Sequence, residues 1–356
     1  MTEPAAQRSA APDLPDPVDL LDLPPDAIDL AALRILGRVH RTPMLATRTG
    51  ARLVAASTGV RLGGGPSGGA EPRLFLKAEH LQLTGSFKPR GAINRVLGLS
   101  SQERFRGLIA VSAGNHAQAV ALAGAAAGAA VTVVMPAMAS RAKAEAAAAY
   151  GATVILHGHE MADTFARMEE LRARDGLTLM HPFDDPGVIA GQGTVGLEIL
   201  DDLPLVDVVV AASGGGGLLG GVAAALKRAR PGVRVYGVEP EGSNALAQGL
   251  AAGEPVPLRP SSIADGLGAP YASQWTIDLA RRYVDDVILL DEATIARGMR
   301  FALERMKQLL EPAGAAALGA VIAGRIPLRD GETVCAIASG GNVDLARLPE
   351  LLALAG

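Results

Sequence analysis

The segment Thr84–Ala92 places a lysine in an unusual setting. Lys88 is one of only five lysines in the 356-residue chain, and it follows Phe87 between two residues that disfavour a helix, Gly85 and Pro89. A lysine held at a turn between a strand and a helix can act as a nucleophilic amine. Burial lowers its pKa from the free value of about 10.4, which leaves neutral amine to attack an aldehyde. From this segment alone, a basic residue at an ordinary helix start explains the pattern equally well.

A second segment, Ser112–Gln118, follows the apolar run Leu108–Val111 and precedes an alanine-rich helix that begins near His116. The apolar run predicts a short buried strand. Ser112 and Asn115, with a glycine between them, would leave backbone N–H groups free at the positive end of the helix dipole, which is a site for a carboxylate. Ordinary N-capping by Ser or Asn, which needs no ligand, is the alternative that this pattern alone favours.

Four consecutive glycines occupy residues 214–217, between a strand-like run over residues 206–212 and a predicted helix over residues 218–230. Glycines let the backbone approach a phosphate closely, and the start of the following helix adds its dipole. The segment lacks the Gly-Lys-Ser/Thr ending of a P-loop and the spacing of a dinucleotide fingerprint. A tight turn between a strand and a helix remains the alternative.

Together the three segments offer an amine, a carboxylate site and a phosphate site, in that order. Pyridoxal phosphate with an amino acid needs all three. The chain also contains the segment Ala338–Asn342 after a strand-like run over residues 333–337. Its Ser339 could form a hydrogen bond with a pyridine nitrogen.

With these motifs in this order, the chain resembles the fold-type II pyridoxal phosphate enzymes, and within them the threonine dehydratase and serine racemase group. The resemblance extends from about Arg41 to Asp344. Further agreement comes from four segments, residues 191–194, 239–240, 263–266 and 311–315.

This resemblance implies roles for individual residues. Lys88 would carry the cofactor as a Schiff base, Phe87 would pack against the cofactor ring, and Asn115 would bond the ring hydroxyl. Ser339 would face the pyridine nitrogen. The phosphate would be held by Gly214, Gly215, Gly216, Gly217 and Leu218. The residues implied for substrate binding are Ser86, Ser112, Ala113, Gly114, Asn115 and His116.

The order of strand-like and helical segments predicts an α/β protein. The strand-like runs are residues 74–76, 108–111, 131–135, 153–156, 206–210, 233–238, 287–290 and 333–337. A helix is predicted from Glu292 to Leu310, with Asp291 as its N-cap. The resemblance implies a tryptophan synthase β-like fold of two open twisted sheets flanked by helices. It also implies a small domain of residues 107–184, inserted in a large cofactor-binding domain of residues 27–106 and 185–356.

Two segments are expected to lie outside this frame. Residues 1–26 contain acidic residues and prolines, which predicts a flexible extension, and they lack the pattern of a signal peptide. Residues 61–72 are rich in Gly and Pro, which predicts a surface loop. The chain ends soon after Asp344, so we expect no C-terminal regulatory domain.

Composition excludes several classes of protein. The chain is 49% hydrophobic, enough for a sizeable core, and its net charge is −4 with 3% aromatic residues, which argues against binding to nucleic acid. No apolar run approaches the ~18 residues of a membrane span. A single cysteine, Cys335, excludes an internal disulfide and fits a cytoplasmic enzyme.

Whether a metal binds stays open at this stage. The resemblance implies that Glu239 could be one ligand of the cation site found in some relatives. Ala245 stands roughly where those relatives have an aspartate, which argues against a divalent ion.

The expected function is a dehydratase that converts L-threonine, and L-serine as a second substrate, to a 2-oxo acid and ammonia, working as a homodimer or homotetramer. Alternatives on the same scaffold are a serine racemase, a β-replacement synthase, or a dehydratase of another 3-hydroxy amino acid such as hydroxyaspartate or phenylserine. A non-catalytic α/β protein that binds a small molecule is an alternative of a different class. Ala113 favours elimination, because the serine racemases have a serine there and a methyl group cannot carry a proton.

Overall fold

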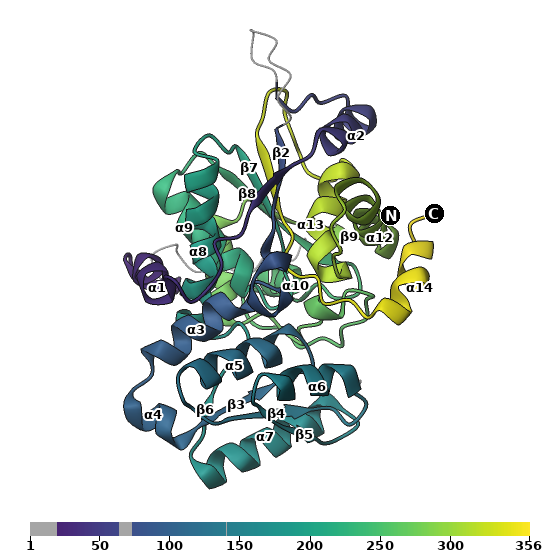
Figure 1. Cartoon of the computed structure of the whole chain (residues 1–356). Coiled ribbons are helices and arrows are strands. Elements are labelled where there is room, and N and C mark those ends of the chain that lie inside the picture. The colour runs from purple at the N-terminus through teal and green to yellow at the C-terminus, as the bar shows by residue number, and fades with distance from the viewer. Residues whose placement is uncertain (1–19, 64–72, 140) are drawn as a thin grey trace, which may run out of the picture.

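The computed structural model describes residues 20–63, 73–139 and 141–356, and its strands form two sheets (Figure 1). The larger sheet has the order β1-β2-β10-β7-β8-β9 and the smaller one β5-β4-β3-β6. The strands are β1 Met44–Ala46, β2 Leu74–Lys77, β3 Leu108–Val111, β4 Val131–Met135, β5 Thr153–Leu156, β6 Thr178–Leu179, β7 Val208–Ala212, β8 Arg234–Pro240, β9 Asp286–Leu290 and β10 Val334–Ile337. Apart from the antiparallel pair of β1 and β2, neighbouring strands run parallel. The predicted α/β fold with two sheets is confirmed.

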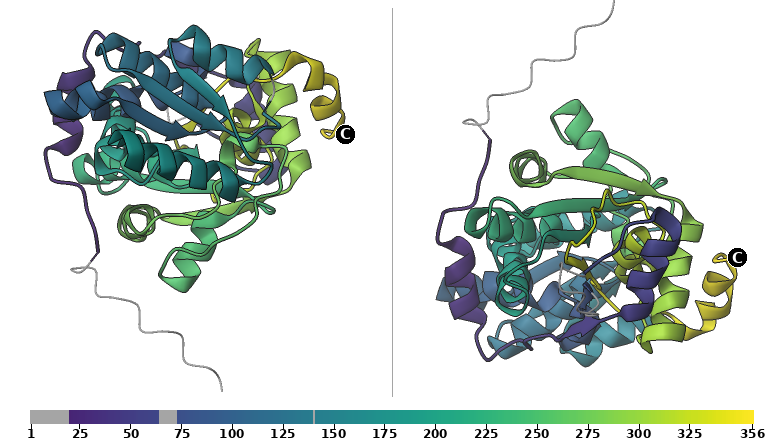
Figure 2. Two further views of the ribbon diagram at one scale, coloured as in Figure 1. Left: turned by 90° about the horizontal axis from the view of Figure 1, so that it is seen from below. Right: turned by 90° about the horizontal axis from the view of Figure 1, so that it is seen from above.

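Helices cover both faces of the larger sheet, as its near-continuous apolar strands require. In β7, Val208 and Val210 pack into a core with one set of helices, α2 Arg48–Thr58, α12 Glu292–Phe301 and α13 Pro312–Ile322. Val209 and Ala211 face the opposite core, which is formed with α8 Pro186–Asp202, α9 Gly217–Ala229, α10 Ala245–Ala252 and α11 Gln274–Tyr283. Cys335 of β10 is buried in this second core. Outside these layers, α1 Ala27–Ile35 packs on α8, and α14 Leu348–Ala353 packs on α12 at the edge of the molecule (Figure 2).

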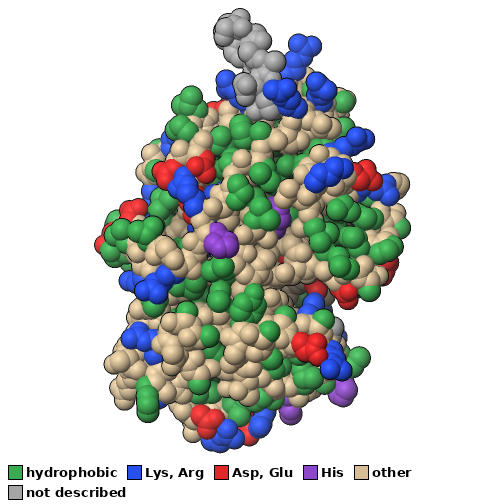
Figure 3. All heavy atoms as spheres, viewed as in Figure 1, with side chains coloured by type: hydrophobic (Ala, Val, Ile, Leu, Met, Phe, Trp, Pro, Cys, Tyr) green, Lys and Arg blue, Asp and Glu red, His purple; other side chains and the backbone are tan. Residues whose placement is uncertain are grey.

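The smaller sheet is layered in the same way. Leu108 and Ala110 of β3 share a core with α5 Asn115–Ala126, and Ile109 and Val111 face α7 Met161–Asp175. The remaining helices of this part are α3 Lys88–Gly98, α4 Ser101–Arg106 and α6 Arg141–Ala149. Helix α3 contacts both α5 and α8, so it links the helices of the two sheets. In the space-filling view the surface is indented where the part with the larger sheet, above, meets the part with the smaller sheet, below (Figure 3).

The sheet topology brings three loops together. The loops that follow β3, β7 and β10 begin at Ser112, Ser213 and Ala338, at the carboxyl ends of parallel strands. In open α/β sheets, ligands bind in the crevice outside these strand ends. The fold therefore directs the three segments singled out by sequence toward one region.

Most predicted elements are present, with shifted ends. The runs at residues 131–135 and 153–156 match β4 and β5, whereas β7 begins at Val208, two residues later than predicted, and β1 and β6 were not predicted. Asp291 caps α12 through Thr294, as predicted. The predicted end of this helix was wrong. The α-helix stops at Phe301, a π-helical turn follows over residues 302–306, and Lys307 takes a φ of 59° that breaks the helix.

The two segments expected to lie outside the frame are only partly described. Residues 1–19 and 64–72 lie outside the described residues, so most of the predicted extension and of the predicted loop is not tested. The last part of the extension packs against the large sheet's helices, since Leu23 is buried and Asp22 accepts a hydrogen bond from Arg228 at 2.6 Å. Strands β3 to β6 lie within residues 107–184, and these domain boundaries stay a prediction. Within the described ranges, no helix combines the length and the hydropathy needed to cross a membrane.

Candidate active site

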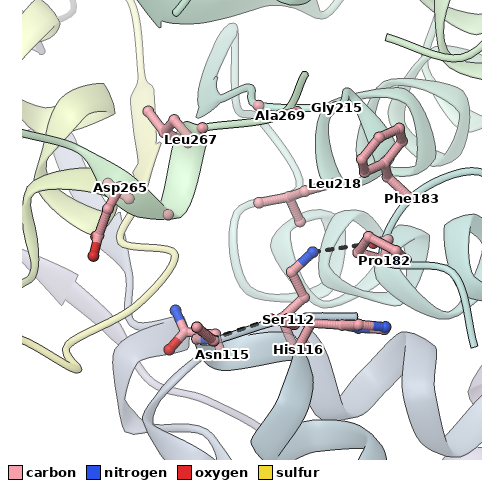
Figure 4. A pocket seen from close by; sticks show the side chains of 18 of the residues that line it. Ser112, Asn115, His116, Pro182, Phe183, Gly215, Leu218, Asp265, Leu267 and Ala269 are labelled. Carbon is pink, nitrogen blue, oxygen red and sulfur yellow. Dashed lines mark hydrogen bonds between the residues drawn. The ribbon is translucent and has the colours of Figure 1, made fainter. Parts of the chain in front are cut away.

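A cavity of about 380 Å³ lies at the three strand ends. It is lined by Lys88, by residues 111–116 after β3, by residues 212–218 after β7, and by Ser339 and Asn342 after β10. The loop Asp265–Tyr271, the segment Leu179–Phe183, Phe87 and Glu311 also line it. Figure 4 shows these groups converging, with Ser112, Asn115 and His116 on one side and Leu267 and Ala269 on the other. The structure thus brings together the amine, the glycine run and the helix start with Ser112 and Asn115 that the sequence identified.

Lys88 is the first residue of α3, and the turn before it is firmly held. Thr84 and Gly85 have positive φ values of 59° and 73°. Phe87 donates its N–H to the carbonyl oxygen of Ser339 at 3.1 Å, and Gly341 donates to that of Gly85 at 2.9 Å. These bonds tie the turn to the loop after β10 and fix the place where the lysine side chain leaves the backbone.

The amine of Lys88 lies inside the cavity. Its Nζ donates to the carbonyl oxygen of Pro182 at 3.0 Å, which is the dashed line that reaches Pro182 in Figure 4, and lies 5.0 Å from the centre of the Phe87 ring. Burial lowers the pKa of Lys88 to about 8, although the carboxylate of Glu311 opposes this shift. A substantial fraction of neutral amine is therefore present near neutral pH, as a nucleophile requires.

The segment Ser112–His116 forms the start of α5. Gly114 is the N-cap and offers no side-chain cap, while the Oγ of Ser112 accepts a hydrogen bond from the N–H of Gly114 at 3.1 Å. Ala117 donates its N–H to the carbonyl oxygen of Gly114 at 3.1 Å, and the N–H groups of Asn115 and His116, which precede it in the first turn, can bind an anion. The Nε2 of His116 lies 2.7 Å from the carbonyl oxygen of Met180, and burial lowers the pKa of His116 to about 3. The ring is therefore neutral, and what His116 can offer a carboxylate is its backbone N–H.

Asn115 connects to a residue to which the sequence assigned no role. Its Nδ2 donates to Oε1 of Glu311 at 2.6 Å, and its Oδ1 accepts from Nδ2 of Asn342 at 2.8 Å. Burial raises the pKa of Glu311 to about 7. Glu311 lies in one of the segments that carried the family resemblance. Its position just before a proline that starts a helix could have marked it as a residue of the site.

The glycine run makes a cradle at the start of α9. The N-cap Gly216 has a φ of +89° and no side-chain cap, so the N–H groups of the first helical turn are free of side-chain partners. A Cβ at Gly215 would lie 2.3 Å from the Phe183 ring, and one at Gly214 would lie 3.1 Å from the backbone of Leu267. Only glycine therefore fits between this backbone and its neighbours Phe183 and Leu267.

Two serines, Ser339 and Ser86, were also predicted to belong to the site. The Oγ of Ser339 donates to the carbonyl oxygen of Ala313 across 3.3 Å, and the hydroxyl can rotate to donate to a ligand nitrogen instead. The Oγ of Ser86 is buried with no hydrogen-bond partner among the described residues. Ser86 is not among the residues that line the cavity, so its predicted contact with the substrate stays a prediction.

Three aromatic rings line the cavity beside Lys88. The rings of His181 and Phe183 lie 4.7 Å apart edge to face, and those of Phe183 and Tyr271 lie 5.6 Å apart. The Tyr271 hydroxyl lies 3.2 Å from Nε2 of His181.

A network of charged side chains lies next to the start of α3. It was not predicted from the sequence. The side chain of Arg90, two residues after Lys88, is fully buried and donates to Glu79 at 2.8 Å and to Glu198 at 2.7 Å. Lys77 is also fully buried and donates to Glu198 at 2.6 Å. Charged residues at the end of the apolar strand β2 were the signal that could have revealed it. The network joins β2, α3 and α8, and so anchors the helix that begins at Lys88.

The described residues contain no group of three His, Cys, Asp or Glu side chains that could hold a metal ion. The Glu239 carboxylate instead accepts hydrogen bonds from the N–H groups of Leu246 and Ala247, both at 2.9 Å. This carboxylate therefore stabilises the start of α10.

The cavity fits pyridoxal phosphate. Lys88 provides an amine for its aldehyde, the open backbone of residues 214–218 provides N–H groups for its phosphate, and Ser339 provides a hydroxyl for its pyridine nitrogen. The buried Lys88 amine and the start of α9, whose N–H groups have no side-chain cap, are the two features of the described residues that a bound group would use.

Comparisons with known proteins agree with this geometry. The family described as "Pyridoxal-phosphate dependent enzyme" matches residues 60–340. The chain is 42% identical over 278 residues to the L-threonine dehydratase catabolic TdcB of Staphylococcus aureus, covering 77% of this chain and 80% of that protein. The structure of maize serine racemase superposes with a TM-score of 0.82 at 34% identity, covering 91% of this chain and 95% of that one.

The processed form of threonine deaminase isoform 2 from Solanum lycopersicum is similarly close in structure, with a TM-score of 0.81 and 32% identity over 96% of this chain and 99% of that chain. The region matched by the family model includes Lys88, the start of α5, the glycine run and Ser339. On the strength of this match over most of its length, the chain belongs to the pyridoxal-phosphate dependent enzymes.

Proposed function

We propose that the protein is an ammonia-lyase that converts L-threonine, and L-serine as a second substrate, to a 2-oxo acid and ammonia. The observation that carries the proposal is the convergence, in one cavity, of the Lys88 amine, the uncapped start of α5 and the open glycine backbone of residues 214–217. The similarity to a catabolic L-threonine dehydratase at 42% identity supports the same reaction.

The residues of this chain divide the work of the reaction. The N–H groups at the start of α5, with the hydroxyl of Ser112, bind the substrate carboxylate. Lys88 then accepts the proton from Cα of the substrate, because its lowered pKa keeps neutral amine available. The carboxylate of Glu311 holds Asn115 through a 2.6 Å hydrogen bond and keeps that amide in a fixed orientation.

Pyridoxal phosphate, when bound, supplies an electron sink for the pair left on Cα. The N–H groups of residues 214–218 would hold its phosphate, Phe87 its ring and Ser339 its pyridine nitrogen. The Ser339 hydroxyl is neutral, so it does not favour protonation of that nitrogen in the way a carboxylate does. A moderated electron sink favours elimination over transamination.

A serine racemase is the second candidate, and the structural similarity to maize serine racemase favours it. Racemisation needs a second acid–base group on the face of Cα opposite Lys88. Ala113 lines the cavity at the position where the resemblance places a serine in racemases, and its methyl group carries no proton. This residue favours the ammonia-lyase.

The test is to measure oxo-acid release over a panel of 3-hydroxy amino acids: L-threonine, L-serine, 3-hydroxyaspartate and phenylserine. We expect the fastest release from L-threonine. A protein that stays colourless and takes up no pyridoxal phosphate would instead be a non-catalytic binding protein, and the proposal would fail.

We further infer that the enzyme is cytoplasmic and a homodimer or homotetramer. The single cysteine, buried and unpaired, supports a reducing compartment. Family resemblance supports the oligomer. Sedimentation of the purified holoenzyme measures its mass and tests the second inference.

A further inference from the structure

The hydrogen bond between His181 and Tyr271 determines where the tyrosine can direct its proton. The Nδ1 of His181 accepts hydrogen bonds from two backbone N–H groups, that of Asp184 at 2.8 Å and that of Phe183 at 3.4 Å. An imidazole nitrogen that accepts cannot carry a proton in the neutral ring, so the proton of His181 resides on Nε2. The backbone therefore selects one tautomer.

The neutral state of His181 follows from its surroundings. Burial lowers its pKa to about 4, and the nearby Lys88 ammonium acts in the same direction. Nε2–H consequently donates to the Oη of Tyr271 across the 3.2 Å contact. The phenol oxygen already accepts there, so its own hydrogen points away from His181.

Tyr271 keeps that hydrogen at neutral pH, because burial and the nearby Asp184 raise the pKa of its phenol above the ordinary value. Within the described ranges, His181 is the hydrogen-bond partner recorded for this hydroxyl. Tyr271 lines the cavity, so its hydrogen is available to a group bound there. A preoriented donor with no acceptor of its own is thus presented to whatever the cavity holds.

The position of Tyr271 indicates which part of a substrate it meets. Its ring packs edge to face on Phe183, which covers the glycine run at Gly215 and Gly217. The residue before Phe183 is Pro182, whose carbonyl oxygen holds Lys88. The carboxylate site at the start of α5 is formed by a different loop, after β3. Tyr271 therefore lies on the side of the glycine run and of Lys88, and not in the loop that forms the carboxylate site.

We propose that the Tyr271 hydroxyl, oriented by His181, donates a hydrogen bond to the β-oxygen of a 3-hydroxy amino acid and gives its proton to the departing hydroxide. The inference rests on the proposed ammonia-lyase function, and it names the acid that protonates the departing β-hydroxyl group. As Lys88 accepts the Cα proton, the Cα–Cβ double bond forms. The Cβ–O bond breaks with its electron pair on oxygen, and the Tyr271 proton completes a water molecule.

The balance of this step needs no further reactant. The Lys88 ammonium returns its proton to the Tyr271 phenolate through solvent, and the enamine product takes up water to give the 2-oxo acid and ammonia. The transfer is downhill, since an ordinary phenol has a pKa of about 10 and water one of about 15.7. Positioned proton donors contribute about 100-fold or more to rates.

The experiment compares two leaving groups in the holoenzyme. Tyr271→Phe keeps the ring that packs on Phe183 and removes only the hydroxyl. We expect turnover of L-serine to fall about 100-fold. Turnover of β-chloro-L-alanine should change little, because chloride leaves without a proton. Tyr150→Phe makes the same chemical change outside the cavity lining and should leave both rates at the wild-type value.

The outcomes separate this inference from the proposed function. Equal losses with both substrates would mean that Tyr271 only binds or packs, and unchanged rates would mean that it takes no part; either result overturns the inference. A wild-type holoenzyme that releases no oxo acid from L-serine or L-threonine, yet eliminates chloride, would instead overturn the proposed function.

A second measurement needs neither cofactor nor turnover. Nitrogen-15 NMR of histidine-labelled protein reports the tautomer of each ring, and the chain has only six histidines. A His181→Phe variant assigns the signal. We expect His181 to carry its proton on Nε2 across the neutral range. A ring protonated on Nδ1 would direct the Tyr271 hydrogen toward His181 and overturn the inference.

Discussion

The side-chain nitrogen of Asn115 donates to Oε1 of Glu311 across 2.6 Å, which joins the start of α5 to the start of α13 at the floor of the cavity. Because Glu311 is buried, its carboxylate acts at short range through a medium of low dielectric constant. Its negative charge favours the ammonium form of Lys88 and so opposes the effect of burial on that pKa. The two groups are thus linked electrostatically.

Replacing Glu311 by Gln should shift the pH dependence of cofactor capture. Neutral amine is the reactive form, so the rate at which the apoprotein takes up pyridoxal phosphate should rise with pH through the Lys88 pKa of about 8. In Glu311→Gln the opposing charge is gone, the Lys88 pKa falls further, and the rise moves to lower pH. Stopped-flow absorbance measures this. Glu145→Gln, on an exposed ion pair, is the control, and a shift toward higher pH would contradict the argument.

Lys88→Ala should abolish turnover and covalent cofactor attachment, since Arg and His provide no primary amine in its place. Borohydride reduction followed by peptide mapping should find the label on Lys88 in the wild type. Lys227→Ala, which removes an amine outside the cavity lining, should retain both properties. Label on Lys77 or Lys143 would disprove the assignment.

Gly215→Val combined with Gly216→Val should lower the affinity for pyridoxal phosphate about tenfold or more, which corresponds to about 1.4 kcal/mol. The new side chains would clash with neighbours, since a Cβ would lie 2.3 Å from the Phe183 ring at Gly215 and 2.7 Å from Thr276 at Gly216, and the backbone that is proposed to bind the phosphate would have to move. Equilibrium dialysis measures the affinity, and circular dichroism checks the fold. Gly232→Val, where a Cβ has open space, is the control. Wild-type affinity in a folded double variant would mean that the run is only a turn.

Ala113→Ser should raise racemisation of L-serine relative to the wild type, because it introduces a hydroxyl that can return a proton to Cα. Wild-type dehydration should greatly exceed racemisation. Chiral chromatography of L-serine incubations, with pyruvate measured in parallel, gives both rates. D-serine that accumulates in the wild type as fast as pyruvate would contradict the ammonia-lyase proposal.

Arg90→Met should destabilise the protein by about 3–5 kcal/mol, because it leaves the buried carboxylate of Glu79 without its cationic partner. Urea unfolding measures the change. Arg41→Met breaks ion pairs at a residue whose side chain is 53% exposed, and it should cost about 1 kcal/mol or less. Comparable losses in the two variants would show that burial of the network adds nothing.

The sequence predicted those parts of the fold that local patterns determine. Apolar runs bounded by polar residues identified the buried strands, and β4 and β5 have the predicted ends. Strand β6 was missed because it has only two residues, Thr178 and Leu179, which is too short for any periodicity. The end of α12 was missed because the left-handed conformation of Lys307 depends on tertiary packing and not on its own preference.

The same distinction applies to the site. Lys88, the start of α5 and the glycine run are local motifs, and their convergence follows from the order of the parallel strands. Glu311, His181 and Tyr271 act through partners distant in sequence. Tyr271 and His181, for example, are 90 residues apart. The tautomer of His181 depends on backbone N–H groups of the loop that follows it. No pattern of residue types predicts where those N–H groups point.

The single cysteine has a practical consequence for studying motion between the two sheets. Cys335 is fully buried, and burial raises the pKa of its thiol to about 12, so almost no reactive thiolate forms at neutral pH. A cysteine introduced at an exposed position would therefore be the only thiol that a fluorescent reagent modifies. With one such cysteine on α6 and another on α12, a pair of dyes would report the distance between the two helices. A shorter distance on addition of substrate would show that the smaller sheet moves toward the larger one.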